Sequence, residues 1–239
     1  MSGLHKSFYR YTAFLKEATV AAFTPPDELL QAWQRDGIFL RAFLLQQRRV
    51  QMVCASTATI SPVQIAQRLK GRLNHCLRQQ SPAYPGFDRD FFLGTLGQND
   101  RDIVAAYIRN QVDHSDLVDP LYRERLKVLR FHEDPGQPPR GKHKGIHDHH
   151  LHIVLVTQGR YRMFPQEAKK VSVSIIEGGE SVGMDIMEFS IMPDHAHILA
   201  RPDHHRNPQQ SLDDLKSASS QQLRRTRLRF PQFADSGGA

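Results

Sequence analysis

Short apolar runs alternate with polar, turn-forming segments in the second half of the chain. Residues 151–157 and 185–192 are apolar runs of strand length, and runs of this kind between turn residues predict buried strands. A helix is expected to open at Ser211, because apolar and small residues then recur at helical spacing as far as Leu223.

The first half repeats this plan. Residues 50–62 match residues 190–202 in length and in the positions of methionine and proline, and an apolar helical stripe follows from Ile65 to Leu77. A chance similarity between two α/β segments is the alternative. The pattern predicts an α+β fold of two ferredoxin-like or RRM-like modules, each an antiparallel sheet with helices on one face, arranged as a pseudo-dimer.

These patterns divide the chain into a first copy over residues 1–113, a linker rich in charge and proline over 114–145, and a second copy over 146–239. The net charge of +7 and the pI of about 9.6 favour a polyanionic partner. The two cysteines suggest no disulfide framework and no thiolate zinc site. Because signal-peptide and membrane-spanning patterns are also absent from the sequence, we expect a cytoplasmic protein.

Two histidines, His195 and His197, interrupt an apolar run that reads as a buried strand. Residues i and i+2 of a strand point to the same face, so the two imidazoles would lie side by side and could grip a divalent metal. The alternative is a strand that carries two hydrogen-bonded histidines.

The two copies differ in the chemistry that they carry. In the expected alignment Ala55 stands at the place of His195 and Thr57 at the place of His197, so the first copy lacks the histidine pair. It has instead a helix, expected over about residues 100–112 and capped by Asn99, on which Tyr107 and Gln111 share one stripe. An ordinary amphipathic helix is the alternative for these two residues.

The run from Phe189 to Leu199, with its Met-Pro-Asp-His-x-His word, resembles the HUH motif of single-tyrosine transposases from simple bacterial insertion sequences, including the REP-associated tyrosine transposases. Further similar words are Thr157 to Phe164, Leu215 to Leu223 and, in the first half, the Tyr-Ile-x-x-Gln word at Tyr107. The chain resembles a fused tandem pseudo-dimer of this family, in which each copy retains one of the two motifs.

The resemblance implies a single-strand DNA endonuclease and strand-transferase that acts in DNA transposition and recombination. Tyr107 would be the nucleophile that forms a 5′-phosphotyrosine link, and His195, His197 and Gln111 would bind Mg²⁺ or Mn²⁺. The expected partner is single-stranded DNA with hairpin ends, with further self-association of the chain as an option and no membrane.

Basic side chains predict where DNA would lie. Arginine and lysine residues on two helices could flank a groove, with solvated charge as the alternative; these are Arg68, Lys70, Arg72, Arg224, Arg225 and Arg227. A histidine-rich segment over residues 143–152 is expected to be polar surface near the DNA rather than a metal site.

Two rival functions remain open on the sequence. The first is a domesticated, catalytically inactive protein that binds DNA or RNA hairpins. The second is an unrelated metal hydrolase in which the histidine pair activates water. Cleavage that requires a metal would separate the first rival from a transposase, and a covalent adduct on Tyr107 would exclude the second.

Overall fold

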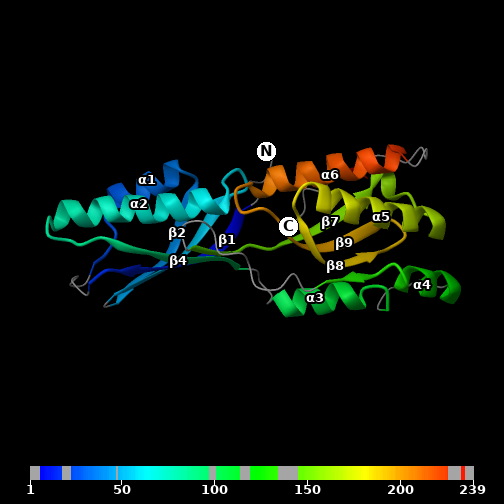
Figure 1. Cartoon of the computed structure of the whole chain (residues 1–239), viewed down its shortest axis with the longest axis horizontal. Coiled ribbons are helices and arrows are strands. Elements are labelled where there is room, and N and C mark those ends of the chain that lie inside the picture. Colours follow the sequence, from blue (N-terminus) through cyan, green and yellow to red (C-terminus); the bar gives the residue numbers. More distant parts are fainter. Residues whose placement is uncertain are drawn as a thin grey trace. The chain divides into compact units, whose positions relative to one another are not determined.

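The computed structural model describes residues 6–17, 23–46, 48–96, 101–113, 119–133, 145–225 and 233–234. The chain folds as two compact units, each built from segments that are separated in the sequence (Figure 1). The first unit contains residues 1–98, 137–149 and 204–208, and the second contains residues 99–136, 150–203 and 209–239.

The first unit is a five-stranded sheet with two helices. Its elements are β1 (Lys6–Leu15), α1 (Asp27–Arg35), β2 (Ile38–Gln46), β3 (Arg49–Thr57), α2 (Pro62–Gln80), β4 (Phe87–Leu96) and β6 (Gly145–Asp148). The strand order is β2-β3-β1-β4-β6, and all pairs are antiparallel except β4 with β6. This β-α-β-β-α-β chain with β1 and β3 in the centre confirms the predicted ferredoxin-like module.

One face of this sheet forms the core of the unit. Alternate residues of β1 and β3 are buried against α1 and α2, among them Tyr9, Tyr11, Val50, Met52, Trp33, Leu69 and Leu73. The helix α2 begins at Pro62 because the hydroxyl of Ser61 accepts the N–H of Gln64 while the Gln64 side chain accepts the N–H of Ser61. The other sheet face therefore carries the remaining residues of each strand.

The second unit repeats the arrangement. Its elements are α3 (Arg101–Asn110), α4 (Pro120–Lys127), β5 (Phe131–His132), β7 (Leu151–Thr157), the 3₁₀ turn η1 (Gln158–Arg160), α5 (Pro165–Ser181), β8 (Asp185–Ile191), β9 (His195–Arg201), α6 (Pro208–Arg225) and β10 (Phe233–Ala234). The order β10-β7-β9-β8-β5 repeats that of the first four strands of the first unit, with β5 added at the β8 edge. Both units thus confirm the α+β class.

Helices lie on both faces of the second sheet. Figure 1 shows α5 and α6 on one face and α3 on the other. The core under α5 and α6 includes Ala196, Ile198 and Ala200 of β9, while Leu199 packs with Ile108 of α3 in a separate small cluster. The even-numbered residues of β9 therefore pack beneath α5 and α6, and its odd-numbered residues face α3.

The compact units divide the chain differently from the predicted copies. Residues 99–136, which include α3, belong with the second sheet, although the sequence repeat assigns Tyr107 to the first copy. The predicted ranges 1–113, 114–145 and 146–239 come from a repeat in the sequence. They stay a prediction about two copies in the sequence, and the compact units describe how the chain packs. Much of the expected linker, residues 114–118 and 134–144, lies outside the described residues.

The starts of the strands and helices correct the expected alignment of the copies. The strand β3 begins at Arg49 and β9 begins at His195, and the following helices α2 and α6 begin 13 residues later in each unit, at Pro62 and Pro208, so Arg49 is the structural counterpart of His195. Two residues further along each strand, Gln51 corresponds to His197. The prediction of Ala55 and Thr57 at these places is therefore wrong. It failed because Pro62 and Pro202 were used as matching anchors, whereas Pro62 is the first residue of α2 and Pro202 directly follows β9; the first residue of α6 is Pro208.

Two helix boundaries also differ from expectation. The helix α6 begins at Pro208, and Ser211 is buried within it rather than capping it. The helix α3 ends at Asn110 instead of near residue 112, and its predicted cap, Asn99, lies outside the described residues. Among the helices that the structure describes, none is both long and apolar enough to cross a membrane.

Candidate active site

The two histidines of the paired motif lie on the α3 face of β9. Residues 196, 198 and 200 point into the core beneath α5 and α6, so His195 and His197 face the opposite side. The His195 side chain is 21% exposed and His197 is 6% exposed. Their rings meet edge to face with centroids 5.0 Å apart. The pair is thus sheltered but open to solvent on the His195 side.

Asp194 orients His195 from the turn between β8 and β9. Its Oδ1 lies 2.6 Å from Nδ1 of His195, and Arg160 donates a hydrogen bond to its Oδ2 at 3.3 Å. Burial raises the pKa of Asp194, but the hydrogen bonds from His195 and Arg160 outweigh burial and hold it below its ordinary value. An ionised Asp194 favours the His195 proton on Nδ1, which leaves Nε2 as the nitrogen for a metal.

A third histidine, His152, supports His197 from the neighbouring strand. Nε2 of His152 lies 3.2 Å from Nδ1 of His197. Burial lowers the pKa of His152, and burial together with the charges of His195 and His152 lowers the pKa of His197 to about 4. Both rings are therefore neutral at pH 7, which is the form in which imidazole binds metals.

Sequence analysis assigned no role in the site to His152. The feature that places His152 in the site is the pairing of β7 with β9, in which Val154 is opposite His197. His152 stands two residues before Val154 and therefore shares the face of His197. The sequence does not specify this register, so the contact could be found only from the structure.

The helix α3 brings Tyr107 to these histidines. The Tyr107 ring lies edge-on to His197 at a centroid distance of 5.6 Å and to His152 at 6.2 Å. Tyr107 is 51% exposed, so its hydroxyl is accessible to a large substrate. Tyrosine and histidine pair thus meet inside one compact unit.

Two contacts hold α3 against the sheet. Ile108, which is fully buried, packs with Met187 and Leu199. Arg109 forms an ion pair at 2.5 Å with Glu188, whose side chain is only 3% exposed and which also lies 2.6 Å from Nδ1 of His132. A buried carboxylate with two cationic or hydrogen-bonding partners gives the helix one defined position.

Gln111 lies just beyond the end of α3. It is half-buried in the turn that follows the helix, and its backbone N–H donates to the carbonyl of Ile108 at 3.2 Å. Gln111 therefore follows the helix that carries Tyr107. The role of Gln111 as a third metal ligand stays a prediction.

The donor set of the site fits a divalent ion. Asp194 and His152 engage Nδ1 of His195 and of His197, so Nε2 is the nitrogen of each ring that these contacts do not use. A carboxylate behind a ligand histidine, as Asp194 lies behind His195, is a usual support of metal-binding histidines. Two imidazole nitrogens completed by oxygen ligands suit Mn²⁺ and tolerate Mg²⁺.

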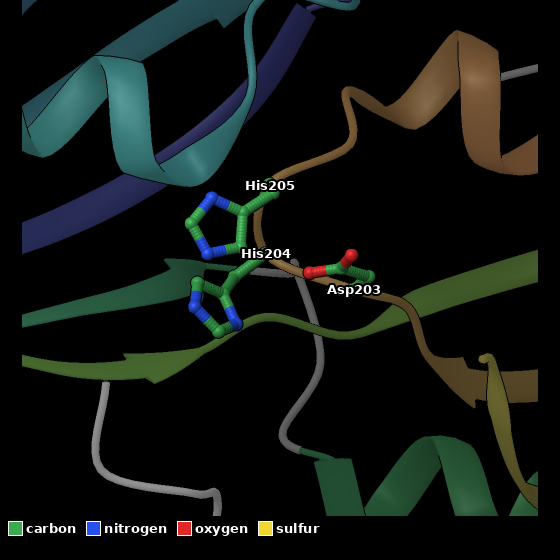
Figure 2. A group of neighbouring side chains, drawn as sticks. All are labelled: Asp203, His204 and His205. Carbon is green, nitrogen blue, oxygen red and sulfur yellow. The ribbon is translucent and has the colours of Figure 1, made fainter. Parts of the chain in front are cut away.

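A separate group of possible ligands was not predicted. Asp203, His204 and His205 follow β9 directly, and one potential ligand atom from each lies within 4.8 Å of the others (Figure 2). Asp203 and His205 are exposed. These three residues are consecutive in a surface segment, whereas the predicted pair has support from flanking strands. We therefore assign them no role in catalysis.

The histidine-rich segment is partly structural. His147 is buried in the first unit, where its ring stacks on His204 at 4.7 Å and burial lowers its pKa to about 4. His149 is buried and stacks on Tyr9 at 5.8 Å. His143 lies outside the described residues. The expectation of polar surface is therefore wrong for His147 and His149, because β6 carries the segment into the sheet of the first unit.

The predicted DNA-binding side chains of α2 make contacts within the first unit. Arg68 donates to the carbonyl of Asp36 at 3.0 Å, Arg72 pairs with the Asp36 carboxylate, and Lys70 donates to the carbonyls of Asp88 and Arg89. These contacts are structural, and a DNA contact by the three side chains stays a prediction.

The corresponding cluster on α6 is more open. Arg224 and Arg225 are exposed at the end of the helix, and Arg225 also lies 3.4 Å from Oε1 of Gln222. Arg227 lies outside the described residues. DNA binding by this cluster also stays a prediction.

Comparison with known proteins places the chain in a family. The family described as "Transposase IS200 like" matches residues 9–111 and 145–235. A solved structure of a candidate transposase from Deinococcus radiodurans is 19% identical, with 46% of this chain and 95% of that chain covered and a TM-score of 0.35. The regulatory subunit of aspartate kinase from Thermus thermophilus is 11% identical, with 91% and 92% covered and a TM-score of 0.23. Both TM-scores are low, so neither likeness bears on the function of this chain. No curated protein matches the chain.

The family match rests on most of the chain. It spans both sheets and includes Tyr107, Gln111, His195 and His197. The chain belongs to the family of IS200-like transposases.

Proposed function

We propose that this transposase cleaves and rejoins single-stranded DNA through Tyr107, as an HUH-type, single-tyrosine enzyme of the REP-associated kind. The observation that carries the proposal is the position of the Tyr107 ring, 5.6 Å from His197 and within the same compact unit. The proposed nucleophile and the proposed metal-binding pair come from separate elements of this one unit.

The chemistry follows from the residues present. The phenol oxygen of Tyr107 attacks the phosphorus, a new O–P bond forms, the bond to the 3′ oxygen breaks, and the 3′-OH leaves with a proton. A divalent ion held by His195, His197 and Gln111 would polarise a non-bridging phosphate oxygen. Because the phosphotyrosine link conserves the bond energy, a 3′-OH can later attack it and release Tyr107 without ATP.

The phenol of Tyr107 must lose its proton in this step. A tyrosine has an ordinary pKa of about 10, so a neighbouring acceptor assists at neutral pH. His152 lies beside Tyr107, but when Nε2 of His197 holds a metal, the Nδ1–H of His197 donates to Nε2 of His152 and leaves His152 no free lone pair for the phenol proton. Tyr107 is 51% exposed, so we assign the role of proton acceptor to solvent water. The anchored helix α3 supplies the orientation that an in-line attack requires.

A hairpin-binding protein without cleavage activity is the second candidate. It is favoured by the first unit, where Arg49 and Gln51 stand at the positions of the histidine pair, so one of two possible sites has lost its ligands. The two candidates share DNA binding and differ in covalent chemistry.

The experiment that tests the proposal is incubation with 3′-end-labelled single-stranded hairpins and Mn²⁺ or Mg²⁺, resolved on a denaturing protein gel, because a 5′-phosphotyrosine link retains the fragment that carries the 3′ end. We expect a metal-dependent band shift that is lost in Tyr107→Phe and His195→Ala. Tyr161→Phe is the matched control, because Tyr161 is a 39% exposed phenol that bonds to Glu167. Hairpin binding without any adduct would support the second candidate, and product formation without an adduct would indicate a hydrolase.

A further inference from the structure

The first unit retains the place of the active site but carries different charges there. The starts of β3 and β9 and of the helices that follow them match Arg49 with His195 and Gln51 with His197. Counting back one residue from each strand start, Arg48 stands where Asp194 stands in the second unit. The first unit thus carries two arginines and a glutamine where the second unit carries an aspartate and the two proposed metal ligands.

Arg48 and Arg49 line a cleft. A cavity of about 570 Å³ is bounded by Phe14, Gln46, Arg48 and Arg49. The Arg48 guanidinium is held in place, because it donates to the carbonyl of Leu15 at 3.1 Å and also to that of Lys16. Phe14 is 42% exposed and lies opposite Arg49 across the β1–β3 pair. The cleft therefore combines a positioned cation with an open aromatic face.

The same sheet face extends this character along β1. Tyr9, Tyr11 and Ala13 are buried in the core, so Phe8, Arg10, Thr12 and Phe14 occupy the other face. Phe8 is 43% exposed, and the Arg10 guanidinium lies over the Phe92 ring at 5.0 Å. Alternating arginine and aromatic side chains on a sheet are suited to a polymer of phosphates and flat bases.

We propose that this face of the first unit is a non-catalytic subsite for single-stranded DNA. The Arg49 guanidinium contacts a phosphate at the place where the second unit would hold a metal ion, and Phe14 stacks on the adjoining base. A guanidinium supplies the positive charge and donors for a phosphate, but it brings no ligand water and no nucleophile. The subsite therefore holds the strand without cutting it. The inference rests on the proposed function in one respect, that DNA is the substrate.

The test measures binding without chemistry. Full-length protein carrying Tyr107→Phe is titrated into a fluorescently labelled single strand without divalent metal, and anisotropy is recorded at several salt concentrations. We expect Arg49→Gln to weaken binding about three- to tenfold and to lower the salt slope by about 0.7, the contribution of one phosphate contact on a single strand. Arg49→Lys should retain most of the slope.

Two further variants make the assignment specific. Phe14→Ala should reduce affinity about fivefold or more through lost stacking while leaving the slope unchanged. Arg35→Gln is the matched control, because Arg35 is an exposed arginine at the end of α1, on the helical side of the same unit. It should change both quantities by less than Arg49→Gln.

The outcomes separate this inference from the proposed function. An unchanged slope in Arg49→Gln, a loss no greater than that of Arg35→Gln, or tighter binding to duplex than to single strands would overturn the subsite. Loss of slope in Arg49→Gln together with no adduct in the cleavage assay would retain the subsite and reject catalysis by Tyr107. An adduct with an unchanged slope would do the reverse.

Discussion

Truncation of Ile108 is expected to release α3 from its sheet while the rest of the second unit stays folded. Ile108 is 0% exposed, but its cluster is small and contains only Met187 and Leu199 as buried partners, with Val104 and Ala105 partly buried. The core beneath α5 and α6 is a separate cluster. The substitution Ile108→Ala therefore acts on the attachment of one helix.

The magnitude follows from what Ile108 buries. Truncating a buried isoleucine to alanine costs about 2–5 kcal/mol, and a small cluster that can relax belongs at the low end, about 2–3 kcal/mol. At about 1.4 kcal/mol for each factor of ten, the docked population of α3 relative to the undocked one falls about 30- to 150-fold. The ion pair of Arg109 with Glu188 remains in the variant.

Hydrogen exchange is the assay, because it reports local opening residue by residue. We expect faster exchange for the amides of α3 and little change for β7, β8 and β9, with a lower rate of adduct formation under the same conditions. Ile175→Ala is the matched control. Ile175 is also 0% exposed, but it lies in α5 in the larger core, so this variant should lower the stability of the whole unit.

One result would refute the reasoning. If Ile108→Ala accelerates exchange equally in α3 and in β7–β9, α3 belongs to the cooperative core and is not a separately attached element. A normal exchange rate for α3 in the variant would mean that Ile108 contributes little to its attachment.

The remaining predictions concern one glycine, one ion pair and the metal site. Gly37 has a φ of +77°, and an added Cβ would lie 2.8 Å from side-chain atoms of its neighbours, so Gly37→Ala should destabilise the first unit by about 1–3 kcal/mol, measured by urea unfolding; an unchanged midpoint would contradict this. A hydrogen bond from Arg72 holds the pKa of Asp36 below its ordinary value, so the ionised Asp36 stabilises the folded state fully above about pH 4 and less as the pH falls through the folded-state pKa. The difference in unfolding free energy between wild type and Asp36→Asn should be flat from pH 7 to 5 and shrink below pH 4. A difference that does not shrink there would refute the assignment. His197→Ala should weaken Mn²⁺ binding at least about tenfold in calorimetry, whereas His75→Ala, an exposed histidine of α2, should not, and equal affinities in the two variants would argue against the histidine pair as ligands.

Local sequence patterns were sufficient for much of this protein. Strand and helix periodicities identified both modules, because each buries one face of its sheet and the sequence repeats at the period of the element. The spacing of His195 and His197 placed both on one face of β9 for the same reason. The α+β class and the transposase family also follow from contiguous words of the chain, since these need no knowledge of long-range contacts.

Only the tertiary structure decided which elements meet. It assigned α3, and with it Tyr107, to the second sheet through the burial of Ile108 and the pairing of Arg109 with Glu188. It set the strand register that brings His152 to His197, and the strand and helix starts that match Arg49 with His195. A register shift of two residues preserves every alternation of apolar and polar positions, so periodicity cannot distinguish the alternatives. Packing between distant segments distinguishes them, because only one pairing buries all the apolar faces at once.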